Sequence, residues 1–193
     1  LKLIAAFLGV NAVESVRKTA VVRCGGDNEK AKRAALYNGV SDCKSAVFAA
    51  GGAKGCQYGC LGLGTCSRIC PFGAIEMING LALVHPDICT GCGKCIAACP
   101  RRIISLVPAS AQVHVLCCSP QKGAVKKNFC SVSCIGCRKC VKAAEGQMLI
   151  EGFLAKTNYE NPPGPELVEK AACPTGCLKN PPPPARKQDK EAA

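Results

Sequence analysis

The pattern of apolar and polar positions predicts several short elements. Residues 74 to 88, AIEMINGLALVHPDI, are apolar and partly alternating around Asn79-Gly80, which indicates a two-stranded hairpin. The segments AVVRC and HVLC each indicate a strand that ends in a cysteine. The opening LKLIAAFLGV has about half the apolar length of a membrane-spanning helix and therefore predicts a packed helix. The closing NPPPPARKQDKEAA is proline-rich and charged, which favours an extended, disordered tail.

Composition changes this picture, because the apolar elements are short and cysteine is abundant. The 193 residues include 18 cysteines, 4% aromatic residues and no tryptophan. A chain of this kind forms one or two compact units held by disulfides or metal rather than by a large apolar core. No secretory signal sequence opens it, so metal is favoured over disulfides. Because the first residue is not methionine, we expect an upstream segment with a membrane anchor to be missing.

The formal net charge of +12 narrows the class of partner. Lysine and arginine are spread along the chain without interleaved aromatic residues, which argues against nucleic acid. Thiolates bound to iron would also make the loaded protein less basic than its sequence indicates. A basic face for an acidic protein partner is the better interpretation.

The segment CTGCGKCIAACP carries the most specific metal-binding pattern. Its cysteines, followed by Pro100, have the spacing of a bacterial ferredoxin. We expect the first three to form a loop around one four-iron cluster, and the fourth, Cys99, to begin a helix and ligate a second cluster. Zinc sites need neither the third cysteine nor the Cys-Pro ending. Because Cys99 is expected to ligate the second cluster, the first takes its fourth ligand from another run of cysteines, the partner run. Its predicted ligands are Cys70, Cys89, Cys92 and Cys95.

The partner run lies upstream, in CQYGCLGLGTCSRICP. Leu63 occupies the place of the second cysteine, and leucine cannot bind iron. Cys56 is the expected substitute; the alternative is that Cys56 is a buried free thiol, which would leave a three-ligand or three-iron site. The predicted ligands of this cluster are Cys56, Cys60, Cys66 and Cys99.

An internal repeat predicts a second module. CLGLGTCSRICP, starting at Cys60, recurs as CIGCRKCVKAAE, starting at Cys134, and a later segment ends in Cys173-Pro174. One cluster of this module keeps a full set of ligands, namely Cys134, Cys137, Cys140 and Cys173. Its neighbour has lost every ligand, because the equivalent positions are Ala144, Pro163, Glu166 and Glu169. The sequence therefore predicts three 4Fe–4S clusters.

Six cysteines remain outside these sets: Cys24, Cys43, Cys117, Cys118, Cys130 and Cys177. Their context is partly repeated. Cys130 stands four residues before Cys134 as Cys56 stands before Cys60, and both predicted strands end in a cysteine. This repetition suggests a fourth iron–sulfur site, for which the candidates are Cys24, Cys43, Cys117, Cys118 and Cys130. The alternative is buried free thiols with no metal. His85 and His114 receive no role.

The segments CQYGCLGLGTCSRICPFGAI, CTGCGKCIAACP and CSVSCIGCRKC together resemble the B subunit of the Rnf complex, an ion-translocating ferredoxin:NAD oxidoreductase. VVRC with NGVSDCKSA and the VLCC segment extend the resemblance over roughly residues 1 to 178. It implies a protein at the cytoplasmic face of the cell membrane that takes electrons from reduced ferredoxin and passes them to other subunits. The sequence departs from the family in two places: the N-terminal membrane helix with the following four-cysteine motif is not in it, as expected if an upstream segment is missing, and the second module has lost one cluster.

These observations predict an α+β fold of tandem bacterial-ferredoxin-like modules with an N-terminal α/β segment. The expected divisions are an N-terminal segment (1–50), a two-cluster module (51–110), a module that retains one cluster (111–180) and a tail (181–193). The chain contains no nucleophile with its base, no P-loop and no dinucleotide motif, so we expect no substrate chemistry of its own. Two alternatives remain: an iron–sulfur subunit of a hydrogenase, formate dehydrogenase or heterodisulfide reductase, and a zinc-stapled interaction module.

Overall fold

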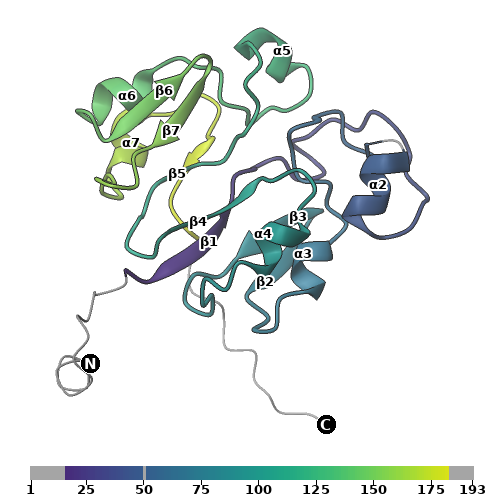
Figure 1. Cartoon of the computed structure of the whole chain (residues 1–193). Helices are drawn as coiled ribbons and strands as arrows, with labels where there is room; N and C mark the ends of the chain where they lie inside the picture. Colours follow the sequence, from purple (N-terminus) through teal and green to yellow (C-terminus); the bar gives the residue numbers. More distant parts are fainter. Residues whose placement is uncertain (1–15, 50, 183–193) are drawn as a thin grey trace, which may run out of the picture.

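The structure is a computed structural model, and it describes residues 16–49 and 51–182. Within these residues short helices and four two-stranded sheets are joined by long loops (Figure 1). The helix expected over residues 1–10 and most of the expected tail lie outside the described residues. No described helix is long and apolar enough to cross a membrane.

The first unit consists of a hairpin and two short helices, one before and one after it in the sequence, that pack against each other. Its elements are α3 (Thr65–Arg68), β2 (Ile75–Ile78), β3 (Leu81–Val84) and α4 (Lys94–Ala98). Strands β2 and β3 pair antiparallel, with Ile78 opposite Leu81. Between them, Asn79 and Gly80 have φ angles of 45° and 70°, which is the backbone of a tight two-residue hairpin turn. The predicted hairpin is confirmed.

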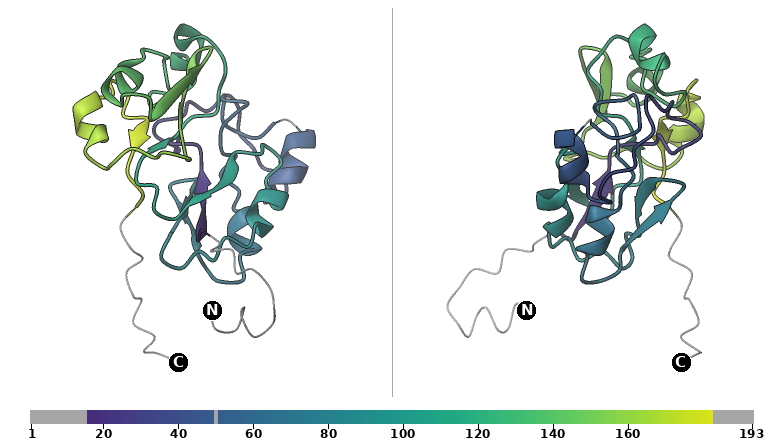
Figure 2. Two further views of the ribbon diagram at one scale, coloured as in Figure 1. Left: turned by 60° about the vertical axis from the view of Figure 1, so that its left-hand side comes forward. Right: turned by 90° about the vertical axis from the view of Figure 1, so that its right-hand side faces the viewer.

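The second unit repeats the same order of elements. These are α6 (Lys139–Ala143), β6 (Met148–Glu151), β7 (Leu154–Thr157) and α7 (Leu167–Ala171). Strands β6 and β7 again pair antiparallel, and α6 packs against α7 as α3 packs against α4. The two units lie on opposite sides of β1 and β4, as the two views in Figure 2 also show.

Segments outside the hairpins pair with one another across long stretches of sequence. Strand β1 (Lys18–Val22) pairs antiparallel with β4 (Ile104–Pro108), so it lies against the first unit. Strand β5 (His114–Val115) pairs with β8 (Leu178–Lys179) beside the second unit. The strands expected before Cys24 and Cys117 are therefore present. Helices α2 (Cys43–Ala49) and α5 (Gly123–Lys127) lie further out.

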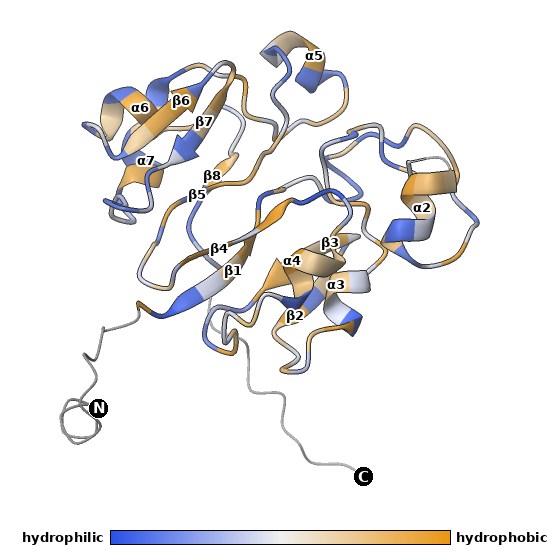
Figure 3. Cartoon of the chain, in the orientation of Figure 1, coloured by the Kyte–Doolittle hydropathy of each residue, from blue (hydrophilic) through white to orange (hydrophobic). Residues whose placement is uncertain are grey.

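Each unit has its own small apolar core. In the first, Val84 of the hairpin lies in one core with Ala20 of β1 and Ile104 of β4. In the second, Met148 and Val113 are fully buried with Leu167 of α7. Figure 3 shows apolar residues along β4 and β6. It also shows them at one end of α2, where Phe48 is 92% exposed.

Backbone hydrogen bonds join the two halves of the chain directly. The amide of Lys32 donates to the carbonyl of Phe129 at 2.8 Å, and the amide of Ser131 donates to the carbonyl of Lys30 at 2.9 Å. Ala31 and Cys130 thus form an antiparallel bridge. This pairing brings Cys130 from the second half against the loops of the first.

Candidate metal centres

Three cysteine-bearing loops share one backbone conformation. They span residues 60–66, 89–95 and 134–140, and each has positive φ angles at its third and fifth positions. These positions are Gly62 and Gly64, Gly91 and Gly93, and Gly136 and Arg138. The first loop is therefore built like the other two. Leu63 lies where they carry Cys92 and Cys137.

The first glycine of each loop allows close contact with a neighbouring backbone. A Cβ atom on Gly62 would lie 2.4 Å from the carbonyl oxygen of Gly80, and one on Gly91 would lie 2.5 Å from that of Lys18. Gly136 packs in the same way on Phe153, at 3.0 Å. The hairpin turns and β1 thus hold the loops in place, and no larger residue fits without displacing backbone.

The sequence predicts that Cys99, the fourth cysteine of the run that starts at Cys89, begins a helix. In the structure it does not. Helix α4 already contains Cys95 and ends at Ala98, and Cys99 follows it with φ −84° and ψ 108°. Pro100 explains the difference, because a residue before proline avoids the helical region. The extended backbone directs Cys99 away from its own loop.

The site around Cys89 brings together the predicted cysteines. Cys70, Cys89, Cys92 and Cys95 line a cavity of about 330 Å³ between residues 70–75 and the second loop. The amide of Ala20 on β1 donates to the Cys89 sulfur at 3.4 Å. Burial is the largest influence and would raise the pKa of Cys89, but the hydrogen bonds to its sulfur, first among them that of the Ala20 amide, and the charge of Arg17 together lower the pKa. Cys92 is exposed, so one edge of this site reaches the surface.

The site around Cys60 differs from the prediction in one residue. Cys60, Cys66 and Cys99 line a cavity of about 380 Å³, and the fourth cysteine in it is Cys43. Cys56 lines a different cavity, which Cys60 shares, so the arrangement favours Cys43 over Cys56 beside these three cysteines. Burial first, and then the neighbouring thiols, raise the pKa of Cys66 to about 12.

Helix α2 delivers Cys43 to this site, and Thr65 fixes its position. The amide of Cys43 donates to Thr65 Oγ1 at 2.8 Å, and Thr65 Oγ1 donates to Asp42 Oδ1 at 3.0 Å. Thr65 is the first residue of α3 and stands next to Cys66. The start of α2 is thereby attached to the loop that carries the other thiols.

The site of the second unit brings together its four predicted cysteines and one more. Cys134, Cys137, Cys140 and Cys173 line a cavity of about 360 Å³ with Cys177. The amide of Ala155 on β7 donates to the Cys134 sulfur at 3.5 Å, as Ala20 does at Cys89. Cys137 is exposed. Cys177, which the sequence left without a role, is buried with its sulfur 3.7 Å from that of Cys173.

Cys177 acts on the protonation of its neighbours. A hydrogen bond from its thiol is the first cause that lowers the pKa of Cys134, to about 5, and of Cys173, to about 4. The same two hydrogen bonds raise the pKa of Cys177 itself. With Cys177 as the donor, Cys134 and Cys173 would accept as thiolates.

Apolar side chains fill the place of the absent ligands in the second unit. Ala144 is buried at 3% exposure in the core that contains Met148 and Leu167. Glu166 and Glu169 are exposed to solvent. Packing of this kind leaves an apolar core where the first unit has a cysteine-lined cavity.

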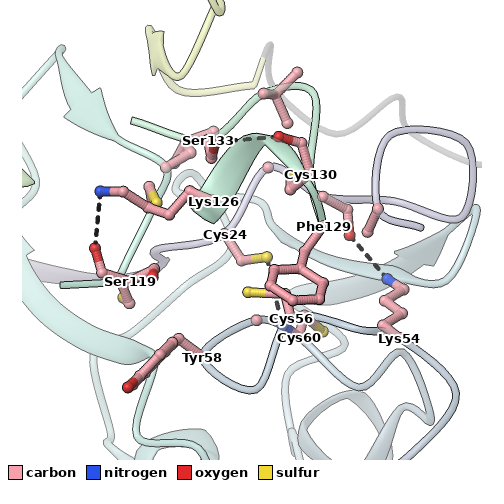
Figure 4. A pocket seen from close by; sticks show the side chains of 18 of the residues that line it. Cys24, Lys54, Cys56, Tyr58, Cys60, Ser119, Lys126, Phe129, Cys130 and Ser133 are labelled. Carbon is pink, nitrogen blue, oxygen red and sulfur yellow. Dashed lines mark hydrogen bonds between the residues drawn. The ribbon is translucent and has the colours of Figure 1, made fainter. Parts of the chain in front are cut away.

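A fourth cysteine-lined cavity lies between the two units (Figure 4). The cysteines that line it are Cys24, Cys56, Cys60, Cys117, Cys118 and Cys130. Buried Lys54 and Lys126 also line it. Sequence reasoning missed both lysines, and a buried lysine has no sequence signature that marks it.

The donor chemistry of these sites fits iron–sulfur clusters. In the described residues, no three cysteine, histidine or acidic side chains converge as the ligands of one metal ion would. Instead, the thiols stand around cavities and accept backbone N–H groups, as cluster ligands do.

Comparison with known proteins agrees with this donor set. Residues 64–110 match the family model of the LdpA Fe-S cluster-binding domain. Over 161 residues the chain is 45% identical to the B subunit of the ion-translocating oxidoreductase complex of Methanosarcina acetivorans, covering 82% of this chain and 61% of that protein.

Two further relatives carry related names. The B subunit of the Na(+)-translocating ferredoxin:NAD(+) oxidoreductase complex of Acetobacterium woodii is 43% identical, covering 91% of this chain and 53% of that protein. The proton-translocating counterpart of Clostridium ljungdahlii is 41% identical, covering 91% and 63%. The chain thus spans between 53% and 63% of the length of these relatives. Over most of its own length the chain is thus similar to the B subunits of the ion-translocating ferredoxin:NAD oxidoreductase, or Rnf, complexes.

Proposed function

We propose that this chain is an iron–sulfur electron-transfer subunit of an Rnf-type complex. The observation that carries the proposal is the set of three cavities, each lined by four or more cysteines from a shared loop and from a distant crossing position. When bound, a four-iron cluster takes up and releases one electron at a time.

The proposed ligands follow the cavities. Cys70, Cys89, Cys92 and Cys95 would hold one cluster, and Cys43, Cys60, Cys66 and Cys99 a second. Cys134, Cys137, Cys140 and Cys173 would hold a third. The two hairpin units would then be tandem ferredoxin-like modules (51–110 and 111–180), of which the second holds one cluster.

Two sites are suited to exchange electrons with partners, because each has a cysteine at the surface. Exposed Cys92 stands beside exposed Lys94, and exposed Cys137 stands beside Arg138. Basic side chains next to such an edge favour docking of an acidic protein. Reduced ferredoxin is the proposed donor, and other subunits of a membrane complex, at its cytoplasmic face, are the proposed acceptors. The relatives' names support both assignments.

The test is anaerobic purification of the full chain, followed by iron and acid-labile sulfide analysis. We expect at least about twelve irons per chain and a visible charge-transfer absorption that reduced ferredoxin bleaches. A colourless protein that contains zinc and no sulfide would rule out electron transfer and support the zinc-stapled module. Co-purification with a soluble hydrogenase and no flavin-bearing membrane subunit would contradict the Rnf assignment.

A further inference from the structure

The cavity between the two units contains five cysteines that none of the three proposed clusters uses, one of which is Cys118. The other four are Cys24 and Cys56 from the first half of the chain and Cys117 and Cys130 from the second. Glycines on both sides approach their sulfurs. A Cβ atom on Gly59 would lie 3.5 Å from the sulfur of Cys56 and 3.6 Å from that of Cys24.

A second glycine joins the two halves of this group. A Cβ atom on Gly26 would lie 3.2 Å from the Cys130 sulfur and 3.9 Å from the Cys24 sulfur. The bridge between Ala31 and Cys130 holds this arrangement through the backbone. Cys130 also interacts electrostatically with Cys56 and Cys117, so all four thiols face one space.

These thiols accept backbone amides in the way the other cluster cysteines do. The amide of Gly91 points at the sulfur of Cys89, two residues before it. The amide of Gly136 points in the same way at the sulfur of Cys134. The same relation holds in the central group, for Cys24 with Gly26, for Cys117 with Ser119 and for Cys130 with Val132. Amides directed at sulfur stabilise a thiolate that is bound to metal.

The two halves contribute equivalent pairs. Cys24 and Cys117 each follow the last residue of a strand by two positions, and Cys56 and Cys130 each precede the first cysteine of a loop by four. The amide of Cys60 donates to the Cys24 sulfur at 3.3 Å, and that of Cys134 points at the Cys117 sulfur. Cys118 breaks this pattern, because its thiol donates to the carbonyl oxygen of Arg23 at 3.2 Å.

Two buried lysines give the cavity positive charge. Lys54 is 7% exposed and donates to the carbonyls of Gly26 and Gly80, while Lys126 is 2% exposed and donates to those of Ser119 and Phe153. No carboxylate in the described residues forms an ion pair with either lysine. Figure 4 shows them on either side of Cys24 and Cys56. A buried cation needs a compensating charge, and a four-iron cluster with its thiolates carries roughly −2 when oxidised.

We propose that Cys24, Cys56, Cys117 and Cys130 bind a fourth iron–sulfur cluster, of the 4Fe–4S type, between the two units. Binding replaces four S–H bonds by four Fe–S bonds and releases four protons. Because Cys60 lines both this cavity and the neighbouring one, and Cys117 contacts Cys134, the fourth site connects the first unit with the second. This inference rests on the proposed function and adds the site that makes the row of cysteine groups continuous.

Adjacent cysteines provide a matched test. The full chain, the Cys117→Ala variant and the Cys118→Ala variant are purified anaerobically, and iron, sulfide and reduced spins are counted. We expect about sixteen irons in the parent chain and in Cys118→Ala. In Cys117→Ala we expect about twelve, or about fifteen together with a three-iron signal in the oxidised protein.

Several outcomes separate this inference from the proposed function. About twelve irons and three reduced spins in the parent chain would overturn the fourth site and leave the function intact. A loss of iron in Cys118→Ala but not in Cys117→Ala would overturn the assignment of Cys117 as a ligand. Cys130→Ala is the second variant and must reproduce the loss if Cys117→Ala does not fold. A protein without iron and sulfide would overturn the function itself.

Discussion

The backbone amide of Cys60 donates a hydrogen bond of 3.3 Å to the sulfur of Cys24. Cys60 belongs to one group of thiols and Cys24 to the next, so a single peptide unit joins two neighbouring sites. Changes in one group will therefore affect the electrostatics of the other, and predictions for a single site need variants that isolate it.

Cys43, rather than Cys56, is expected to complete the site around Cys60. In a Cys24→Ala/Cys117→Ala background, which lacks the fourth site, we expect about twelve irons. Adding Cys43→Ala should lower the content to about eight, or to about eleven if a three-iron cluster forms, whereas adding Cys56→Ala should leave it unchanged. Iron and sulfide analysis distinguishes the two cysteines. Loss of iron on adding Cys56→Ala but not on adding Cys43→Ala would return Cys56 to this site.

Leu63 offers a rescue of the same site. It occupies the position of Cys92 and Cys137 in a loop of the same backbone conformation. Leu63→Cys combined with Cys43→Ala should therefore return the iron content to that of the background. If the variant with both substitutions binds no more iron than Cys43→Ala alone, a cysteine at position 63 does not act as a ligand in the way expected of Cys92 and Cys137.

Cys177 is expected to tune the third cluster rather than to bind it. Cys173→Ala should remove that cluster, while Cys177→Ala should keep the iron and lower its reduction potential, because a hydrogen-bond donor to the ligand sulfurs is lost. The measurement is a potentiometric titration followed by electron paramagnetic resonance. Loss of iron in Cys177→Ala with retention in Cys173→Ala would exchange the two roles.

Lys126 is expected to raise the reduction potential at the central site, because it is buried at the cavity wall without a carboxylate partner in the described residues. In Lys126→Met we expect a decrease on the order of 60 mV, which is about 1.4 kcal/mol for one electron. Lys127→Met makes the same change of net charge at an exposed position and serves as the control. Equal shifts in both variants would mean that burial of Lys126 has no electrostatic effect.

His114 is expected to make stability fall in acid. Burial lowers its pKa from 6.5 to about 4 in the folded protein. Below pH 6.5 the unfolded chain binds a proton that the folded protein does not, so the free energy of unfolding decreases as the pH falls towards 4, by up to about 3 kcal/mol. Above pH 6.5 this contribution is constant.

The check is denaturant unfolding of the parent chain and of His114→Gln between pH 4 and 7.5, under anaerobic conditions. The difference between the two curves isolates the histidine from the acid sensitivity of the clusters. Tyr159→Phe, which removes the hydroxyl 3.1 Å from His114 Nδ1, should keep the pH dependence. Parallel curves for the parent chain and His114→Gln would contradict the buried neutral state.

The sequence predicted local geometry well and distant pairing poorly. The Asn79-Gly80 turn and the crossing of Cys70 and Cys173 follow from spacing and turn chemistry, and the structure contains them. The place of Cys43 depends on how α2 folds back onto Thr65, which no local pattern encodes. The repeat did hold a signal for Cys56. Its counterpart Cys130 stands before a loop with a full set of predicted ligands, which points both cysteines to the proposed central site instead.

The backbone hydrogen bonds between residues 30–32 and 129–131 limit which substitutions can disturb the pairing of the two halves of the chain. Every residue except proline carries the same main-chain N–H and C=O groups. Substitutions other than proline at these positions therefore leave the pairing groups in place, so the side chains there can diverge while the backbone bonds are kept.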